Sequence, residues 1–388
     1  MPNGWPDVIE PVSGQTAFGR SDPAAVLSQA ATLLLLGAQL RGDEFAVRAR
    51  AGAAGEKLVE FIAEEDTARF PVPHLMGFGG RFDIQRMQQS LSGRYGRWVL
   101  PELWAEPEAR AKAPEVVPEL ATRFFTKPTH LAAAELMEIS LRHPAELTRV
   151  AAAASYFELS TEPARLIDIL AEGTRSDDQL VREVAATALA AIEPGHASLR
   201  RLTEAPAAAG AAGASGTTML VHGTWAANST WWQPGGDFYS YIWASVRPDL
   251  YENPDRFSWS GVYSDAARLQ AAQDLVAWVT AHNEDGLDLI THSHGGSVAM
   301  LATQSGLRVR ELVLLSCPVH IPKYLPDFAQ VRKIVSIRVH LDLVILADRG
   351  GQRFRLPQIQ ENVLPVWFNH SATHDPSVWT KYNVPAML

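Results

Sequence analysis

The residue best suited to chemistry is Ser293, which stands in the sequence Thr291-His292-Ser293-His294-Gly295-Gly296. Residues 287–290 are largely apolar and predict a buried strand, and the small and apolar residues from Ser297 onward predict a helix. The two glycines carry no side chain that would obstruct a tight turn between this strand and this helix. A serine at such a corner is exposed, and the helix behind it presents its N-terminal amides. A serine nucleophile needs this setting, because its attack on a carbonyl creates an oxyanion.

The composition predicts a globular protein of two domains. The chain has 388 residues, more than one typical core holds, and its 47% hydrophobic and 20% charged residues are ordinary for a globular protein. A net charge of -9 argues against nucleic acid as a partner. Cys317 is the single cysteine, so no internal disulfide can form, and its apolar surroundings predict a buried, inert thiol.

The start of the chain lacks a basic stretch followed by an apolar core, so we expect no signal peptide and a cytoplasmic location. The run Leu33–Leu36 is too short to span a membrane, and charged residues follow it closely. We therefore expect no stable membrane insertion.

Residues 1–202 predict an all-α domain after an irregular stretch at 1–24. Helices are expected at Pro23–Gln39, Phe45–Glu65, Arg81–Leu91, Thr129–Leu141, Pro144–Leu159, Pro163–Glu172 and Asp177–Ile192, with Thr161 and Ser176 as N-caps of the last two. Prolines and glycines predict only short, broken segments across residues 70–128. The helix expected at Asp177–Ile192 resembles one of the HEAT repeat type, although an ordinary helical bundle fits as well. The Ala/Gly-rich residues 203–216 predict a linker.

Residues 217–388 alternate strands with helices, which predicts a mostly parallel sheet with helices on both faces. Strands are expected at Thr217–His222, Arg256–Trp259, Leu287–Thr291, Arg310–Leu315, Val335–Leu341 and Asn362–Phe368, and a helix at Ser264–His282. In such sheets the chemistry collects at the carboxyl ends of the strands. The polar residues expected there are His222, Thr224, Ser293, His320, Asp342, His370 and His374. They include a nucleophile, an acid and a base, in that chain order.

This C-terminal half resembles the α/β hydrolases of the lipase and esterase kind. The resemblance is carried by Val221–Trp225, Phe257–Gly261, the helix that contains Arg268, and Leu289–Gly296. The family's elbow is usually Gly-x-Ser-x-Gly, and Thr291 replaces its first glycine here. The resemblance implies an α/β hydrolase fold preceded by the all-α domain. It also implies a serine hydrolase that cleaves carboxylic esters through an acyl-enzyme, with no cofactor and no metal.

The resemblance also implies the role of each site residue. Ser293 is the expected nucleophile. Asp342 follows its strand directly and is expected to orient the base, with Asp348 as the alternative acid. Either His370 or His374 is the base, because both lie on the loop after the last strand.

The backbone amide of His294 is expected to donate to the oxyanion, together with that of Thr224 or, alternatively, Trp225. His222, Trp231 and Trp232 are assigned to substrate binding. The aromatic residues between 225 and 243 either line an apolar pocket or form a packed core.

Two other functions compete with the serine hydrolase. The order Thr291-His292-Ser293-His294 also looks like the start of the metallo-β-lactamase motif T-H-x-H-x-D-H, but Gly296 and Ser297 stand where its Asp and His are required. A metal-dependent hydrolase using His292 and His294 is therefore one alternative. The other is a hydrolase-like fold that only binds. The expected partner is a small-molecule or lipid-like ester, and the helical domain could support a homo-oligomer.

Overall fold

The computed structural model describes residues 11–41, 70, 72–73, 106–157, 160, 163–203, 217–282 and 286–388. The chain forms two compact units, one mainly of residues 1–192 and the other mainly of residues 193–388. The expected helices at Phe45–Glu65 and Arg81–Leu91, the N-cap Thr161 and nearly all of the expected linker lie outside the described residues.

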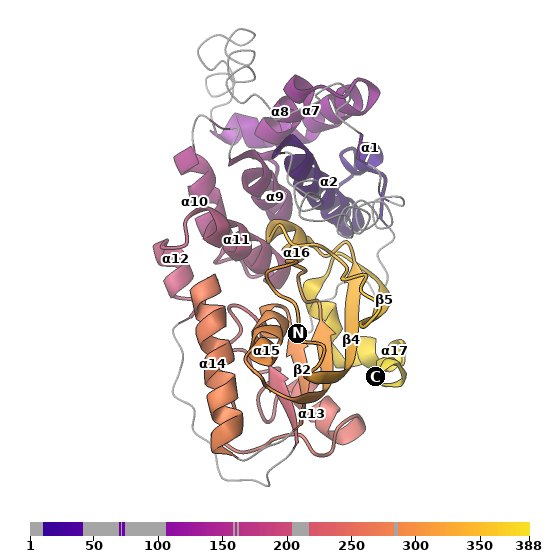
Figure 1. The fold of residues 1–388 in the computed structure, drawn as a ribbon. Coiled ribbons are helices and arrows are strands. Elements are labelled where there is room, and N and C mark those ends of the chain that lie inside the picture. Colours follow the sequence, from indigo (N-terminus) through magenta and orange to yellow (C-terminus); the bar gives the residue numbers. More distant parts are fainter. Residues whose placement is uncertain are drawn as a thin grey trace. The chain divides into compact units, whose positions relative to one another are not determined.

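The N-terminal unit is helical (Figure 1). Its described helices are α1 (Gly14–Ala17), α2 (Pro23–Arg41), α7 (Glu106–Thr126), α8 (His130–Ser140), α9 (Glu146–Tyr156), α10 (Pro163–Gly173) and α11 (Gln179–Ile192). Helices α2 and α9 pack closely, since a Cβ on Gly37 would lie 2.5 Å from Ser155 Cβ. By length and composition, α2 is the one described helix that could span a membrane. However, 72% of its window Pro23–Leu40 is buried, as in a core helix.

Helix α7 corrects the expectation of broken segments over residues 106–126, while residues 74–105 lie outside the described residues. It runs without interruption through Pro114 and Pro118. A stripe of fully buried residues explains the continuity, because burial of one helix face offsets the hydrogen bonds that prolines remove. The stripe consists of Ala113, Val117, Ala121 and Phe124.

The N-cap of α11 also differs from the expectation. Asp178, not Ser176, caps this helix, because Asp178 Oδ1 accepts hydrogen bonds from the amides of Leu180 (2.8 Å) and Val181 (3.2 Å). Ser176 instead accepts from the amide of Asp178 at 3.2 Å and donates to Glu146 at 2.7 Å.

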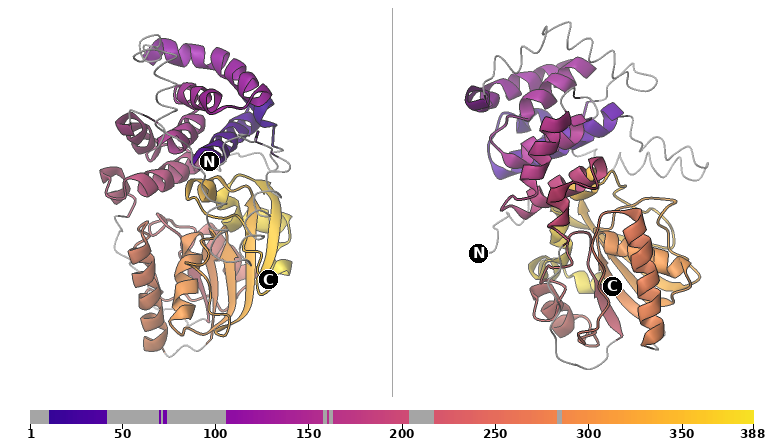
Figure 2. Two further views of the ribbon diagram at one scale, coloured as in Figure 1. Left: turned by 45° about the horizontal axis from the view of Figure 1, so that its top comes forward. Right: turned by 90° about the vertical axis from the view of Figure 1, so that its left-hand side faces the viewer.

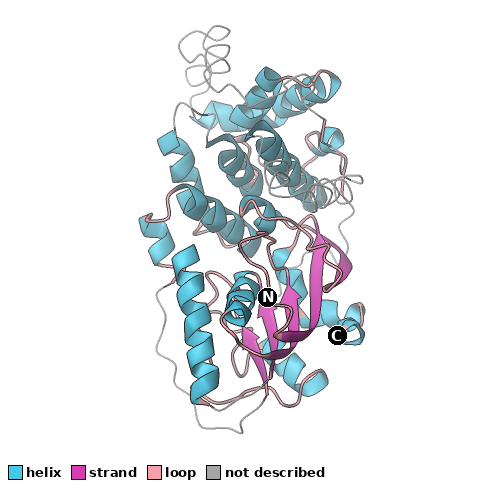
Figure 3. Ribbon diagram, viewed as in Figure 1, coloured by secondary structure: helices cyan, strands magenta, loops and turns pink. Residues whose placement is uncertain are grey.

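The C-terminal unit is built on a parallel sheet in the order β1-β2-β3-β4-β5. All described strands belong to this unit (Figure 3). They are β1 (Thr218–Val221), β2 (Leu287–His292), β3 (Val309–Leu315), β4 (Val331–His340) and β5 (Gln360–Trp367). The strand expected at Arg256–Trp259 is wrong, because that segment is irregular. Its hydrogen bonds go to the loop after β1: the Trp259 indole donates to His222 O at 2.8 Å.

Alternate strand residues bury against opposite faces of the sheet, as its pleat requires. Met219 and Leu289 pack in a core with α14 (Asp265–Ala281) and α15 (His294–Gln304). The left panel of Figure 2 shows these two helices, in orange, on one side of the strands. Leu220 and Ile290 pack on the other face, in a core shared with α13 (Asp237–Ser245) and α17 (Pro376–Lys381). This two-sided burial matches the expected fold class.

The remaining described elements after residue 193 are short: α12 (Ala197–Arg200), α16 (Leu343–Ala347) and the 3-10 helices η3 (His370–His374) and η4 (Val384–Met387). Helix α16 follows β4, and η3 follows β5. The residues expected to act as acid and base therefore stand at the carboxyl ends of two neighbouring strands.

Candidate active site

Ser293 forms the corner between β2 and α15. Its backbone has φ 53° and ψ -133°, a strained conformation for a residue with a side chain. The helix begins at His294, three residues earlier than the sequence suggests. Gly295 is required at this corner, because a Cβ there would lie 2.6 Å from the carbonyl oxygens of Val221 and His222.

Thr291 occupies the place of the first elbow glycine without obstructing the turn. Its side chain points to the neighbouring strand, where the hydroxyl donates to Val313 O at 2.9 Å and is fully buried. The departure from Gly-x-Ser-x-Gly is therefore accommodated within the sheet.

Asp342 and His370 form a buried pair at the ends of β4 and β5. His370 Nδ1 donates to Asp342 Oδ2 at 2.7 Å, and the aspartate side chain is fully buried. The other carboxylate oxygen accepts from the amides of Val344 (3.0 Å) and Ile345 (3.2 Å), at the start of α16. With both oxygens bonded, the carboxylate has one orientation, and it fixes the His370 ring with Nδ1 protonated.

His374 lies on the same 3-10 helix but has a different environment. Its ring stacks on Trp231, with centroids 4.2 Å apart and an angle of 11°. Burial, reinforced by the nearby His370, lowers the pKa of His374 to about 4. His374 is thus a neutral ring in an aromatic contact, whereas His370 makes the hydrogen bond to Asp342.

His292 connects the strand that leads to Ser293 with His370. Its Nε2 donates to His370 O at 3.4 Å, and the two rings are 4.7 Å apart. Burial, with contributions from His374 and His370, holds the pKa of His292 well below its usual value, so its ring is neutral. The residue beside Ser293 therefore touches the backbone of the turn that carries His370.

The loop after β1 lies directly against Ser293. A Cβ on Gly223 would be 2.7 Å from Ser293 Cβ and 2.9 Å from His292 O. The amide of Trp225 donates to Gly261 O at 3.0 Å. No hydrogen bond of the Thr224 amide is found within the described part of the chain. Of the two alternatives for the second oxyanion donor, this geometry favours Thr224.

The three residues assigned to substrate binding have unequal access to a ligand. His222 is 1% exposed, and burial lowers its pKa to about 4. Its Nδ1 donates to Gly223 O at 2.8 Å, so the ring serves the shape of the loop. Trp232 is 2% exposed, and its indole donates to Ala226 O at 2.8 Å. Trp231 is less buried, and its ring stacks on His374, which lies on the same 3-10 helix as His370.

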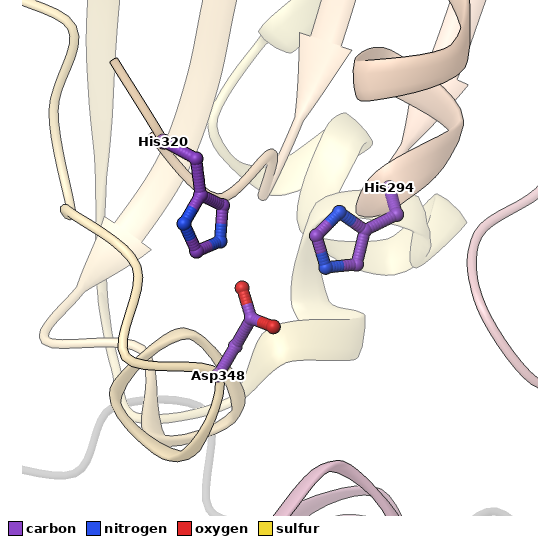
Figure 4. Close-up of side chains that lie close together, drawn as sticks. All are labelled: His294, His320 and Asp348. Carbon is purple, nitrogen blue, oxygen red and sulfur yellow. The ribbon is translucent and has the colours of Figure 1, made fainter. Parts of the chain in front are cut away.

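A second cluster of polar side chains lies on the other side of the elbow. His294, His320 and Asp348 each offer one ligand atom, and these atoms all lie within 4.8 Å of one another (Figure 4). The sequence marks His320 as a strand-end residue and Asp348 as an alternative acid, but it does not indicate that they meet. His292 and His294 face different neighbours: His292 contacts His370 and His374, whereas the ring of His294 stacks on that of His320.

Comparison with known protein families gives one match. A model of the alpha/beta hydrolase family matches residues 219–385, from β1 to beyond α17. The match includes every residue considered above for catalysis. No curated protein matches the chain.

Proposed function

Because the C-terminal half of the chain belongs to the α/β hydrolase superfamily, we propose that this hydrolase is a serine enzyme that cleaves carboxylic esters. The proposed triad is Ser293, His370 and Asp342. The observation that carries it is the buried 2.7 Å hydrogen bond between His370 and Asp342, on the loops that follow β4 and β5. Ser293 stands at the end of β2, which β3 separates from β4 in the sheet, in the strained conformation of a nucleophile elbow.

The reaction begins with attack of Ser293 Oγ on the ester carbonyl carbon, while His370 Nε2 accepts the hydroxyl proton. Asp342 keeps His370 in the required tautomer and stabilises its charged form. The amides of Thr224 and His294 donate to the oxyanion, aided by the N-terminus of α15. His370 then protonates the departing alcohol. A water molecule, deprotonated by His370, hydrolyses the acyl-enzyme and releases the acid.

Aromatic side chains near the elbow support an ester with an apolar group. Trp225 stacks on Tyr263, with centroids 6.3 Å apart, and Tyr263 meets the ring of His294 edge-on. These rings offer large apolar surfaces beside the proposed oxyanion donors. Trp231, whose ring stacks on His374 of the turn that carries His370, offers another.

The test combines labelling by a fluorophosphonate probe with hydrolysis of p-nitrophenyl esters of increasing acyl length. We expect labelling of the wild type and none of Ser293→Ala. Ser293→Ala and His370→Ala should each lower kcat by about 10⁴-fold or more. His374→Ala is the matched control on the same turn, and its kcat should stay within about 10-fold of the wild type.

Two results would contradict the proposal. An inactive His374→Ala beside an active His370→Ala would reassign the base. Folded wild-type protein that neither labels nor hydrolyses any ester of the series would favour a hydrolase-like fold used only for binding.

A further inference from the structure

We infer that His294, His320 and Asp348 form a binding site for a divalent zinc ion, apart from the proposed triad. The three side chains come from separate stretches of the C-terminal half, at the start of α15, after β3 and after α16. In Figure 4 the carboxylate of Asp348 faces both imidazole rings. The ligand atoms lie within 4.8 Å of one another. Zinc bonds of about 2.0–2.2 Å require only small side-chain rotations from this arrangement.

The chemical types of the three ligands favour zinc over calcium and magnesium. Two imidazole nitrogens and one carboxylate oxygen match the donors of zinc, which binds three protein groups and leaves a fourth position open. Calcium and magnesium prefer all-oxygen sites, so they fit this set poorly. The site uses no thiolate, because the one cysteine, Cys317, is not among these residues.

The orientation of His294 is fixed by a neighbour on its own helix. Its Nδ1 lies 3.1 Å from Ser297 Oγ. When Nδ1 donates to this hydroxyl, Nε2 carries the lone pair that a metal requires, and such partners are typical of metal-binding histidines. His294 is 3% exposed and Ser297 is fully buried, so this arrangement is shielded from water.

The backbone also holds the other two ligands in place. Val319, next to His320, and Gly351, three residues after Asp348, exchange two hydrogen bonds of 3.0 and 2.8 Å. The two loops are thereby joined beside the cluster. Asp348 is 6% exposed and His294 is 3% exposed, whereas His320 is only half-buried, so a cation bound by the three would be largely shielded from water.

Positive charge nearby does not oppose the site strongly. The Arg268 guanidinium stacks on Tyr263 and Tyr324, whose rings both contact His294. Asp265 pairs with this arginine at 3.2 Å and also with Lys323. The positive charge of Arg268, next to the cluster, is thus offset in part by Asp265.

The proposal is tested on the full chain after treatment with a chelator, by equilibrium dialysis against zinc and measurement of bound metal. We expect one zinc per chain in the wild type and in Ser293→Ala. His320→Ala and Asp348→Asn should weaken binding by at least about 100-fold, and Ser297→Ala by about 10-fold, as for loss of a partner of a ligand. His282→Ala is the matched control, since His282 pairs with Asp255 at 2.8 Å outside the cluster.

Two outcomes would overturn the inference: a wild type that binds less than one zinc at micromolar concentration, or equal binding by Asp348→Asn. A cobalt-loaded sample gives a second measurement on unaltered protein, because cobalt held by two imidazoles and a carboxylate in a tetrahedral site absorbs strongly in the visible range. Absence of that absorption at saturating cobalt would also count against the site. Neither measurement depends on ester hydrolysis, so failure of the proposed activity would leave the result readable.

Discussion

Gly223 is the residue at which the smallest change should have the largest effect. In Gly223→Ala the new methyl group would lie 2.7 Å from Ser293 Cβ, so the loop after β1 and Ser293, the proposed nucleophile, must separate. We expect kcat/KM to fall by about 100-fold or more, since a displacement of about 1 Å at a reacting group has that effect. Ester hydrolysis measures it.

A matched glycine separates this local effect from general destabilisation. A Cβ on Gly195 meets no atom within 4 Å, so Gly195→Ala should leave both kcat/KM and the thermal midpoint unchanged. Equal activity of the two variants would show that the loop is not close to the nucleophile in solution.

His292 is expected to position the base through the His370 carbonyl. His292→Phe keeps a ring but removes the donor, so the turn loosens and kcat should fall by about 10- to 100-fold with little change in KM. His292→Gln, which retains an N–H donor, should recover part of that loss. If the phenylalanine variant matches the wild type, the 3.4 Å contact has no role in catalysis.

At the level of residues, the sequence could predict candidates but not their pairing. The order of strand ends was enough to propose Ser293, Asp342 and a histidine. His370 and His374 lie four residues apart on one 3-10 helix, and the sequence does not indicate that only the ring of His370 makes a hydrogen bond to Asp342. The sequence also does not indicate that the Trp225 amide donates a hydrogen bond to Gly261 O, because Gly261 lies far along the chain.

Among the elements, α7 gives the clearest prediction. Pro114 lies inside this helix and removes an amide hydrogen bond, so Pro114→Ala should raise stability by about 1–3 kcal/mol, less the entropy that proline removes from the unfolded chain. Thermal unfolding followed by circular dichroism measures the shift. Pro107→Ala is the control, because Pro107 lies in the first turn, where no intrahelical partner is lost. A lower midpoint for Pro114→Ala would show that its ring is needed for packing.

The pattern of apolar residues was sufficient to predict the strands of the sheet, but it also predicted one strand that is not there. The strands β1 to β5 begin or end within a few residues of the expected ranges, because buried parallel strands are short apolar runs bounded by polar residues. The segment Arg256–Trp259 has the same composition yet is no strand. Its indole and backbone groups bond to the loop after β1, and a pattern of hydrophobicity does not reveal such tertiary partners.

At the scale of the whole molecule, buried histidines predict acid sensitivity. The pKa of His222 is about 4 in the folded protein, below its unfolded value of about 6.5. Between these values the unfolded chain binds a proton that the folded chain does not, so stability falls as the pH is lowered. From pH 7 to pH 5 the loss should be about 2 kcal/mol for this histidine.

Urea unfolding followed by tryptophan fluorescence measures this loss, since most tryptophans lie in the C-terminal half. His222→Gln can keep the hydrogen bond to Gly223 O but does not titrate, so its stability should depend less steeply on pH. An unchanged slope would contradict a neutral, buried His222.

The core on the α13 and α17 side of the sheet has a consequence for biosynthesis. It joins Leu220 of β1 to Trp379 of α17, which is fully buried, and Val384 completes it. A ribosome delivers these partners far apart in time. Until α17 has emerged from the exit tunnel, that face of the sheet is covered by α13 without α17, and η3 with His370 has no support from Trp379, whose indole donates to Thr373 O at 2.7 Å. The nascent chain therefore carries Ser293 beside an unfinished core, so we expect hydrolytic competence only after α17 has packed against the sheet.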